Sequence, residues 1–210
     1  DLTDSTDITL RSTVNNVVIR CSNYGEVTSK KNSVGGITGL EELGLVYGSE
    51  SYGSVKSDTG DYAGGIAGNS VSAIAYSLCN INAKAYVGGI VGSGYTVKNC
   101  VSASTITSDG EGLGSIAGTV SEEGEVKGNI FVGDDLDGID NINYAGIADE
   151  KSYEEVMKLE NIPEGFHKVK ITFRAEDNVD IVKTIVYNGS FSEADLPQIP
   201  EKDGYYAVWP

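Results

Sequence analysis

A six-residue motif that recurs along the chain constrains its fold more than any other feature of the sequence. The motif is VGGITG at residues 34–39, and it returns as AGGIAG at 63–68, VGGIVG at 87–92 and LGSIAG at 113–118, with a weaker copy, YAGIAD, at 144–149. Its first glycine position falls at residues 35, 64, 88, 114 and 145, so the spacings are 29, 24, 26 and 31 residues. A period of roughly 20–50 residues is typical of stacked supersecondary units. We therefore predict a repeat fold, with the copy at 144–149 as an atypical terminal unit.

Each unit carries a second apolar position before its motif, at Val27, Val55, Ile81 and Ile106. We predict that a short strand ends at each of these positions, that a polar turn of variable length follows, and that a second strand is centred on the isoleucine of the motif. Strands this short bury their side chains only by stacking, and each apolar side chain buried in this way contributes roughly 1.5–3 kcal/mol. The sequence thus predicts a mostly β protein, a short right-handed parallel β-solenoid of four to five coils with two apolar ladders.

The paired glycines of the motif are predicted to form the corners of the coils. A corner, or a close approach of two backbones, admits glycine at the lowest cost because glycine has no Cβ. The residues expected to build this repeated framework are Gly35, Gly36, Ile37, Gly64, Gly65, Ile66, Gly88, Gly89, Ile90, Gly114 and Ile116.

Composition changes near residue 150. Of the 27 glycines only three follow that point, whereas all four prolines do. The sequence SYEE at 152–155 has the spacing of a capping box and predicts a short helix. The helix should end at 161–163, because the residue before Pro163 avoids the α region. It either covers the open end of the last coil or serves as a linker.

Beyond residue 167 the apolar pattern changes to a period of two, which is typical of half-buried strands. Val169, Ile171 and Phe173 alternate with polar residues, and a second apolar run follows at 181–187. We therefore predict solenoid repeats over residues 1–148, a helix and linker over 149–166, and a small β-rich module over 167–210.

Two resemblances to known families add to this pattern. The motif, together with CSNYGEV at 21–27 and SESYGSV at 49–55, resembles the GLUG-motif repeats of large secreted and surface-anchored bacterial proteins, among them IgA-specific metallopeptidases. In those proteases the repeats lie outside the catalytic machinery, and this sequence has no His-Glu-x-x-His motif. Residues 168–210, with YNG at 187–189 and a P-x-K-D-G-Y-x-x-x-W pattern, resemble the internalin-type B-repeat. That resemblance implies a β-grasp-like module of the kind found in tandem on Gram-positive surface proteins.

The charge and hydropathy of the sequence limit which partners and which cellular locations we expect. The net charge is −16. Nucleic acid and anionic lipid both need clusters of Lys and Arg, so this composition argues against either as a partner. No apolar run approaches the roughly 20 residues that cross a bilayer, and the first residues are acidic and polar rather than a signal peptide. We expect either a cytosolic chain or, in line with the resemblances, an extracellular one whose targeting segment is not in this sequence. Further repeats of the same polypeptide are expected.

Residues suited to catalysis are sparse, and we expect a protein that is not an enzyme. The single histidine is His167, and one histidine with three scattered cysteines cannot make a zinc site. Cys21 and Cys100 occupy equivalent positions three coils apart, ~14 Å at ~4.8 Å per coil, which is beyond the ~7 Å that a disulfide spans. We predict free, buried thiols. The glycine-rich stretches 64–68 and 110–114 lack the following helix of a phosphate site.

Two groups of residues are candidates for binding. Carboxylates alternate before a glycine, as in calcium loops, but without the EF-hand spacing, so a calcium site of another kind competes with a solvated acidic turn at Asp134, Asp135, Asp137 and Asp140. Several tyrosines fall at predicted turns and form either a sugar-stacking strip or partly buried ladders: Tyr24, Tyr52, Tyr62, Tyr86 and Tyr95. No other cofactor is expected.

The sequence therefore predicts a non-enzymatic adhesion or stalk segment of a bacterial surface protein, which presents an extended solenoid face to a host protein or glycan. The polar loops at 29–33, 57–62 and 108–111 are the expected contact regions. Two alternatives are a carbohydrate-binding module that uses the exposed tyrosines and a non-catalytic part of a larger hydrolase.

Overall fold

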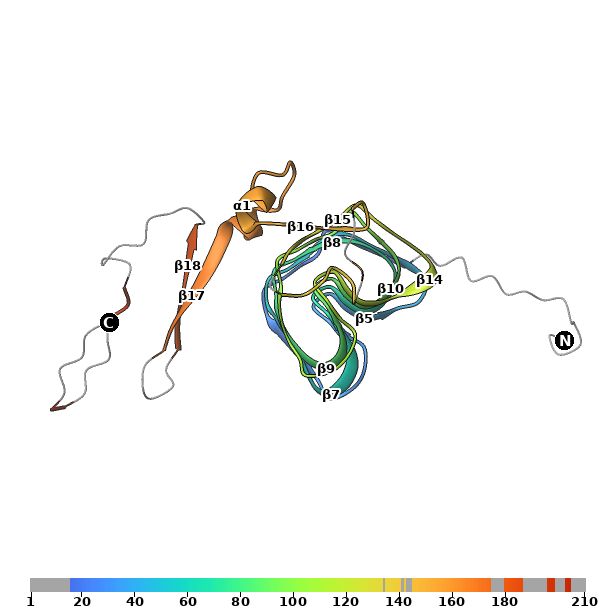
Figure 1. Cartoon of the computed structure of the whole chain (residues 1–210). Helices are drawn as coiled ribbons and strands as arrows, with labels where there is room; N and C mark the ends of the chain where they lie inside the picture. The colour runs from blue at the N-terminus through green and yellow to red at the C-terminus, as the bar shows by residue number, and fades with distance from the viewer. Residues whose placement is uncertain are drawn as a thin grey trace, which may run out of the picture. The chain divides into compact units, whose positions relative to one another are not determined.

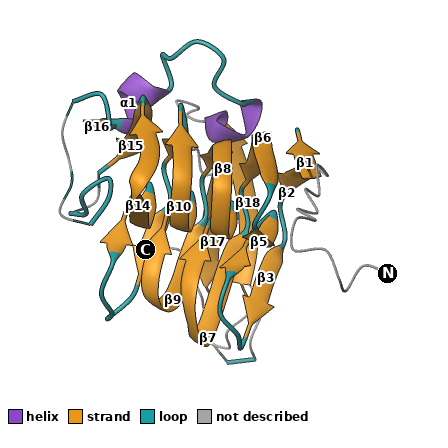
Figure 2. Ribbon diagram, turned by 90° about the vertical axis from the view of Figure 1, so that its right-hand side faces the viewer, coloured by secondary structure: helices purple, strands orange, loops and turns teal. Residues whose placement is uncertain are grey.

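The chain winds through successive turns whose strands pair in parallel with those of the neighbouring turn (Figures 1 and 2). The structure is a computed structural model that describes residues 16–133, 135–140, 142, 145–174, 180–186, 196–198 and 203–204. It divides into two compact units, Asp1–Lys158 and Leu159–Pro210. The first unit contains the solenoid. The division falls inside the segment 149–166, where we predicted a helix and linker.

The turns of the solenoid run from one glycine motif to the next. Turn 1 holds β1 to β4, turn 2 β5 to β7, turn 3 β8 and β9, turn 4 β10 to β13, and an incomplete fifth β14 and β15, with β16 paired to β15. The strands are β1 (Asn16–Ile19), β2 (Ser22–Asn23), β3 (Glu26–Ser29), β4 (Val34–Gly35), β5 (Thr38–Glu41), β6 (Gly44–Ser51), β7 (Ser54–Gly64), β8 (Ala67–Ser77), β9 (Asn80–Gly88), β10 (Val91–Lys98), β11 (Val101–Ser102), β12 (Thr105–Thr107), β13 (Leu113–Gly114), β14 (Ala117–Lys127), β15 (Asn129–Val132) and β16 (Ala148–Lys151). They form a ten-stranded and a six-stranded sheet. The predicted mostly β fold and parallel solenoid are confirmed, with about four turns.

The glycine motif forms the corner between the two sheets, as predicted. Between β7 and β8, Gly65 and Ile66 make the bend. The prediction of a strand centred on this isoleucine was wrong, because the isoleucine itself lies in the bend. The same holds at Ile37, Ile90 and Ile116. Hydrogen bonding continues through the bend: the amides of Ile66 and Ala67 both donate to the Ile90 carbonyl, at 2.9 and 3.1 Å.

The second glycine of each pair packs against a serine on the facing wall of the solenoid. A Cβ placed on Gly65 would lie closer than 3.0 Å to Ser77 Oγ and to the carbonyl of Gly89 in the next turn. The same contact recurs one turn earlier and one turn later, as the pairs Gly36–Ser51 and Gly89–Ser102. All three serines are buried. Only a residue without a side chain lets the corner come this close to the opposite wall, so the coil dents inward there (Figure 1).

The interior holds two apolar cores. The larger one contains the isoleucine ladder, in which Ile66, Ile90 and Ile116 are fully buried and Ile37 packs from one end. The smaller one contains the other predicted ladder, which consists of Val27, Val55, Ile81 and Ile106. Both ladders are confirmed.

The short polar connections predicted between the two ladders differ from one turn of the solenoid to the next. Residues 30–33 and 108–112 form such connections, as predicted, in turns 1 and 4. In turns 2 and 3 the prediction is wrong, because β7 and β9 run without interruption. Their pairing shifts between Ser57 and Asp61, which lie opposite Ala83 and Ala85. A bulge in β7 therefore absorbs the extra residues that appeared to be a turn.

The last copy of the motif, at 144–149, does not form a corner. Its Ala148 pairs instead with Asn129 of β15. The corner position belongs to Gly138, whose carbonyl accepts from the Ile116 and Ala117 amides at 2.7 and 3.1 Å. A Cβ on Gly138 would collide with Ala148 and with the ring of Phe131, so the bend again requires glycine. The prediction of a fifth motif at 144–149 was therefore wrong.

The helix α1 (Tyr153–Val156) begins where the capping box predicted. Ser152 Oγ accepts from the Glu155 amide at 3.3 Å, and Glu155 Oε2 accepts from the Ser152 amide at 2.9 Å. The helix is shorter than predicted, because it ends at Val156 rather than at residues 161–163. Val156 is fully buried, and α1 packs against β15. This packing fits the first of the two predicted roles, in which the helix covers the last coil.

The second unit contains a short 3-10 helix, η1 (Glu164–His167), and an antiparallel hairpin of β17 (Lys168–Arg174) and β18 (Asp180–Val186). Val169 lies opposite Ile185, and Phe173 opposite Ile181. The two predicted strands are therefore present over 168–174 and 180–186, and Tyr187 of the second prediction lies outside the described residues. Most of what we predicted for 187–210 lies outside the described residues.

Gly65→Val tests the corner directly. We expect it to lower the free energy of unfolding by more than about 3 kcal/mol, because the new side chain has backbone on one side and Ser77 on the other. Gly25→Ala is the control, since a Cβ there would meet only Asn23 Oδ1, at 3.6 Å. Urea titration followed by circular dichroism measures both. A loss below ~1 kcal/mol for Gly65→Val would mean that the corner tolerates side chains.

Ile66→Ala tests the larger core. Truncating a fully buried isoleucine should cost about 2–5 kcal/mol. Val71→Ala on β8 is the matched control, because Val71 is 38% exposed and should cost less than about 1 kcal/mol. Equal losses for the two variants would contradict the burial of the ladder.

Candidate functional site: an acidic groove across three turns

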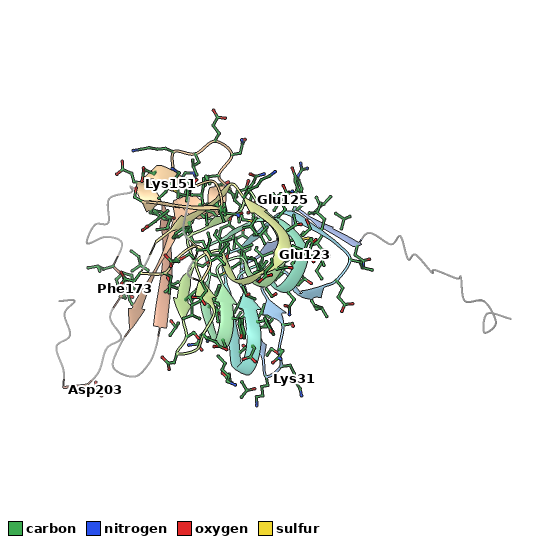
Figure 3. The ribbon with its side chains drawn as sticks, turned by 45° about the vertical axis from the view of Figure 1, so that its right-hand side comes forward. Lys31, Glu123, Glu125, Lys151, Phe173 and Asp203 are labelled. Carbon is green, nitrogen blue, oxygen red and sulfur yellow. The ribbon has the colours of Figure 1, made fainter. Side chains whose placement is uncertain are left out.

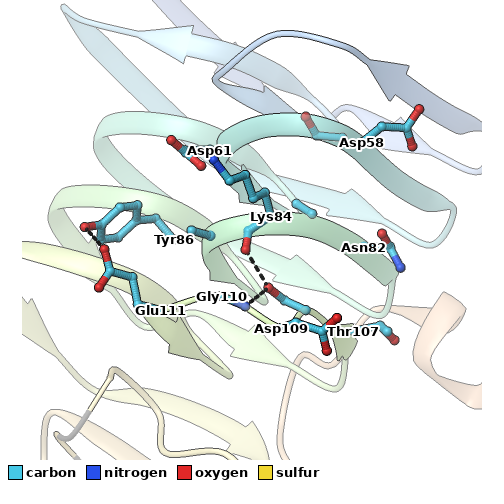
Figure 4. A pocket seen from close by; sticks show the side chains of 13 residues that line it. Asp58, Asp61, Asn82, Lys84, Tyr86, Thr107, Asp109, Gly110 and Glu111 are labelled. Carbon is cyan, nitrogen blue, oxygen red and sulfur yellow. Dashed lines mark hydrogen bonds between the residues drawn. The ribbon is translucent and has the colours of Figure 1, made fainter.

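A groove of about 520 Å³ crosses turns 2 to 4 on the side of the six-stranded sheet (Figure 4). The bulged part of β7, the middle of β9 and the loop after β12 form it. Its lining consists of Ser57, Asp58, Asp61, Asn82, Ala83, Lys84, Ala85, Tyr86, Thr107, Ser108, Asp109, Gly110 and Glu111. Two of the three loops that the sequence singled out, 57–62 and 108–111, thus lie in one site. Residues 29–33 do not line it.

The alternation of β9 explains how the groove obtains its polar side chains. Ala83 and Ala85 are buried, whereas Asn82 and Lys84 are exposed. Successive residues of a strand point to opposite faces, so the small alanines contact the core and the polar side chains line the groove. The loop after β12 is held on β9, since Ser108 Oγ donates to the Lys84 carbonyl at 3.0 Å and accepts from the Gly110 amide at 3.1 Å.

The groove is acidic. Asp58, Asp61, Asp109 and Glu111 line it, and Lys84 is the single cationic residue in its lining. Among the described residues, the ion pairs within 4.0 Å all lie elsewhere. Carboxylates gathered in a concave surface produce a negative potential that attracts cationic partners.

Outside the groove, some of the surface charges form ion pairs. Figure 3 labels Glu125, which accepts hydrogen bonds from Lys127 and Lys98. These two bonds lower the pKa of Glu125 to about 2. The environment of the groove carboxylates therefore differs from that of Glu125 on β14.

Two tyrosines stack at one end of the groove. The rings of Tyr62 and Tyr86 lie 5.0 Å apart with an interplanar angle of 15°. Tyr86 donates to Glu111 Oε1 at 2.9 Å, and this hydrogen bond raises the pKa of the phenol. Both residues have a left-handed backbone, with φ of 63° and 50°, as do Ser33 and Gly112 at the equivalent positions of turns 1 and 4. Backbone of this kind costs a non-glycine residue about 1–2 kcal/mol.

The other candidate tyrosines lie in different places. Tyr24 and Tyr52 stack at 5.2 Å, and Tyr24 is 63% exposed whereas Tyr52 is 6% exposed. Burial, together with a hydrogen bond from Tyr52 to Glu50 Oε2 at 2.8 Å, raises the pKa of Tyr52. Tyr95 lies on β10 of the ten-stranded sheet and is 42% exposed. The structure thus brings the five tyrosines together as two stacked pairs and one separate residue.

The acidic segment proposed for calcium borders a second, smaller hollow. Asp135, Asp137 and Asp140 line a cavity of about 390 Å³ with Glu111. Asp134 lies outside the described residues. Within the described part of the chain, no group of three or more His, Cys, Asp or Glu side chains is placed to hold a metal ion. The segment also supplies the last corner through Gly138, which is a structural function that the sequence pattern did not reveal.

The three cysteines form no disulfide with one another, as predicted, but they are not all buried. Cys79 and Cys100 are buried, and burial raises the pKa of Cys100 to about 12. Cys21 is exposed, because in the described part of the chain it has a neighbouring turn on one side only. Among the described strands, β6 alone stacks beside it. His167 is partly buried and is the last residue of η1.

Comparisons with protein-family models, with curated proteins and with solved structures found no match. The resemblances to GLUG repeats and to the internalin-type B-repeat therefore stay predictions. In the part of the chain that the structure describes, no helix has the length and apolar character needed to cross a membrane.

Glu111→Gln should lower the pKa of Tyr86 toward the usual value of about 10. A glutamine side chain still accepts the hydrogen bond from the phenol hydroxyl, but it lacks the negative charge that opposes formation of the phenolate. Titration of ¹³Cζ-labelled tyrosine by NMR measures this pKa. Glu123→Gln, an exposed carboxylate of β14, is the control and should leave the Tyr86 pKa unchanged. An unaltered pKa in Glu111→Gln would contradict the coupling.

Proposed function

We propose that this chain is a non-enzymatic adhesion or stalk segment of an extracellular bacterial surface protein, and that the acidic groove is the face it presents to its partner. The observation that carries the proposal is that polar segments from three successive turns line one groove of about 520 Å³. A solenoid suits this function because each added turn lengthens the face and stacks on the core of the turn before it.

Charge favours a basic partner. Asp58, Asp61, Asp109 and Glu111 outnumber Lys84 in the lining, and like charges placed across an interface are costly. A host protein with an exposed basic patch fits this groove better than an acidic glycan does. Binding should weaken as salt is added, because exposed charges are screened over about 8–10 Å at physiological ionic strength.

The proposal extends to the rest of the polypeptide. Turns stack at ~4.8 Å each, so further repeats of the same kind would carry the groove away from a bacterial wall. The finer features predicted from the sequence belong here as well: a right-handed coil, and a second unit that continues past the hairpin as a β-grasp-like module.

Carbohydrate binding is the second candidate function, and Tyr24 is the observation that favours it. Its ring is 63% exposed and is held flat against Tyr52 at 5.2 Å. One face of a fixed aromatic ring then remains available for the apolar face of a sugar.

Removing charge from the groove tests the leading proposal. Asp58→Asn/Asp109→Asn removes two groove carboxylates, and Glu122→Gln/Glu123→Gln removes two exposed carboxylates of β14 as the matched control. Binding to immobilised host matrix proteins and to a glycan array is measured at 0.1 M and 0.5 M NaCl. The groove variant should bind at least about tenfold more weakly, and the control within about twofold.

Other outcomes separate the two candidates. Equal effects of the two double variants would contradict a function of the groove. Glycan binding that Tyr24→Ala abolishes and the groove variant retains would favour the carbohydrate-binding candidate. Protease or glycosidase turnover by the pure chain would overturn the non-enzymatic assignment.

A further inference from the structure

Glu41 is a buried carboxylate that lies apart from the groove. It is the last residue of β5, and its exposed fraction is 7%. Its Oε2 accepts three hydrogen bonds: from Ser70 Oγ at 2.8 Å, from the Val71 amide at 2.9 Å and from the Ser72 amide at 3.1 Å. These bonds fix the carboxylate against β8 and satisfy one of its two oxygens.

The other oxygen of Glu41 has no hydrogen-bond partner among the described residues. It lies beside Gly44, since a Cβ placed there would be 3.2 Å from Oε1 and closer still to the carbonyl of Asn16. An unsatisfied buried polar atom costs about 1–3 kcal/mol, and more when the group is charged. A donor that carries positive charge would remove this cost, because it pairs the charge as well as the oxygen.

A pocket of about 280 Å³ opens beside this carboxylate. Glu42 adds a second carboxylate to its lining, and Val18, Leu40 and Leu43 add an apolar wall. Leu40 and Leu43 are 56% and 59% exposed, and exposed side chains change rotamer within nanoseconds. Because Oε1 is buried, a ligand reaches it only when side chains of the pocket wall move. The lining contains no lysine or arginine.

We propose that this pocket binds a cationic nitrogen group, an ammonium or a guanidinium, carried on a short aliphatic arm. The nitrogen donates to Glu41 Oε1, and the arm packs on Val18, Leu40 and Leu43. An anion is excluded because two carboxylates face it. A neutral amide satisfies the hydrogen bond but leaves the charge unpaired. A metal ion lacks ligands, since no metal-binding group of three acidic, histidine or cysteine residues occurs in the described chain.

This chemistry has two sources, a free alkylamine or alkylguanidine and the side chain of a lysine or arginine. One such side chain belongs to the chain itself: Arg11 is the single Lys or Arg among residues 1–15, all of which lie outside the described residues. The experiment must therefore distinguish an external ligand from the protein's own arginine.

The probe is n-butylguanidinium chloride, titrated into the ¹⁵N-labelled full chain. We expect saturable amide shifts at residues 39–44 and 70–72, with millimolar affinity, because so small a ligand gains little binding energy. Glu41→Gln should weaken binding at least about tenfold, since glutamine keeps an acceptor for Ser70 but loses the charge. Glu123→Gln is the charge-matched control and should leave binding unchanged.

Thermal melting checks that Glu41→Gln is folded. If it is not, Glu42→Gln tests the same pocket, because Glu42 is exposed and its removal should weaken binding severalfold without disturbing the core. Arg11→Gln then assigns the source. Tighter binding of the probe in Arg11→Gln identifies Arg11 as the occupant, and unchanged binding identifies a pocket open to an external cation. Either result supports the proposal.

Three results would overturn it. The first is that amide shifts sensitive to Glu41→Gln or Glu42→Gln are absent both in the chain that has Arg11 and in Arg11→Gln. The second is equal binding of n-butanol, which has the same arm and no charge. The third is the same pattern of shifts with CaCl₂ or NaCl alone.

Discussion

The close contact between a corner glycine and a serine of the facing wall is the constraint on which the rest of this structure depends. Gly65 and Ser77 approach so closely that a single methyl group does not fit between them. The corner therefore reaches into the interior of the coil and turns the next isoleucine, Ile66, into the larger core. Because this contact recurs at three successive corners, as Gly36–Ser51, Gly65–Ser77 and Gly89–Ser102, the two apolar ladders remain in register across these turns.

The turns also share a backbone feature close to each corner. Two positions before the first glycine of each corner, one residue has a left-handed backbone: Ser33, Tyr62, Tyr86 and Gly112. Tyr62 and Tyr86 have this conformation in adjacent turns, and the stacking of their rings offsets part of the cost of the strained backbone. Glu111, the residue before Gly112, accepts a hydrogen bond from the Tyr86 hydroxyl.

Much of the framework could be predicted from the sequence, because repeated burial leaves a repeated pattern. The ladders at Ile66 and Val55 and the glycine corners follow from that pattern alone. It does not show whether an isoleucine lies in a strand or at a bend, since both positions are buried. Local similarity also suggested a fifth motif at 144–149. The bend that stacks on the corner of Ile116 contains Gly138 instead, whose carbonyl accepts from the Ile116 amide.

The sites were harder to predict than the framework, since they depend on register. The loops 57–62 and 108–111 were expected to be contact regions, but Lys84 was not, because its place between them follows from the bulge in β7. Period-two alternation in β9 was the signal that could have revealed it. Glu41 left no signal at all: the residues that hold it are 29 to 31 positions away.

A double-mutant cycle on Gly65 and Ser77 tests the central claim most directly. Gly65→Ala is measured in the wild-type chain and in Ser77→Gly, which removes the Oγ and Cβ atoms that the new methyl group would meet. The free energy of unfolding is obtained from urea titrations of all four proteins. If the corner packs against the facing wall, Gly65→Ala should cost at least about 1 kcal/mol less in the Ser77→Gly background. An identical cost in both backgrounds would contradict this account.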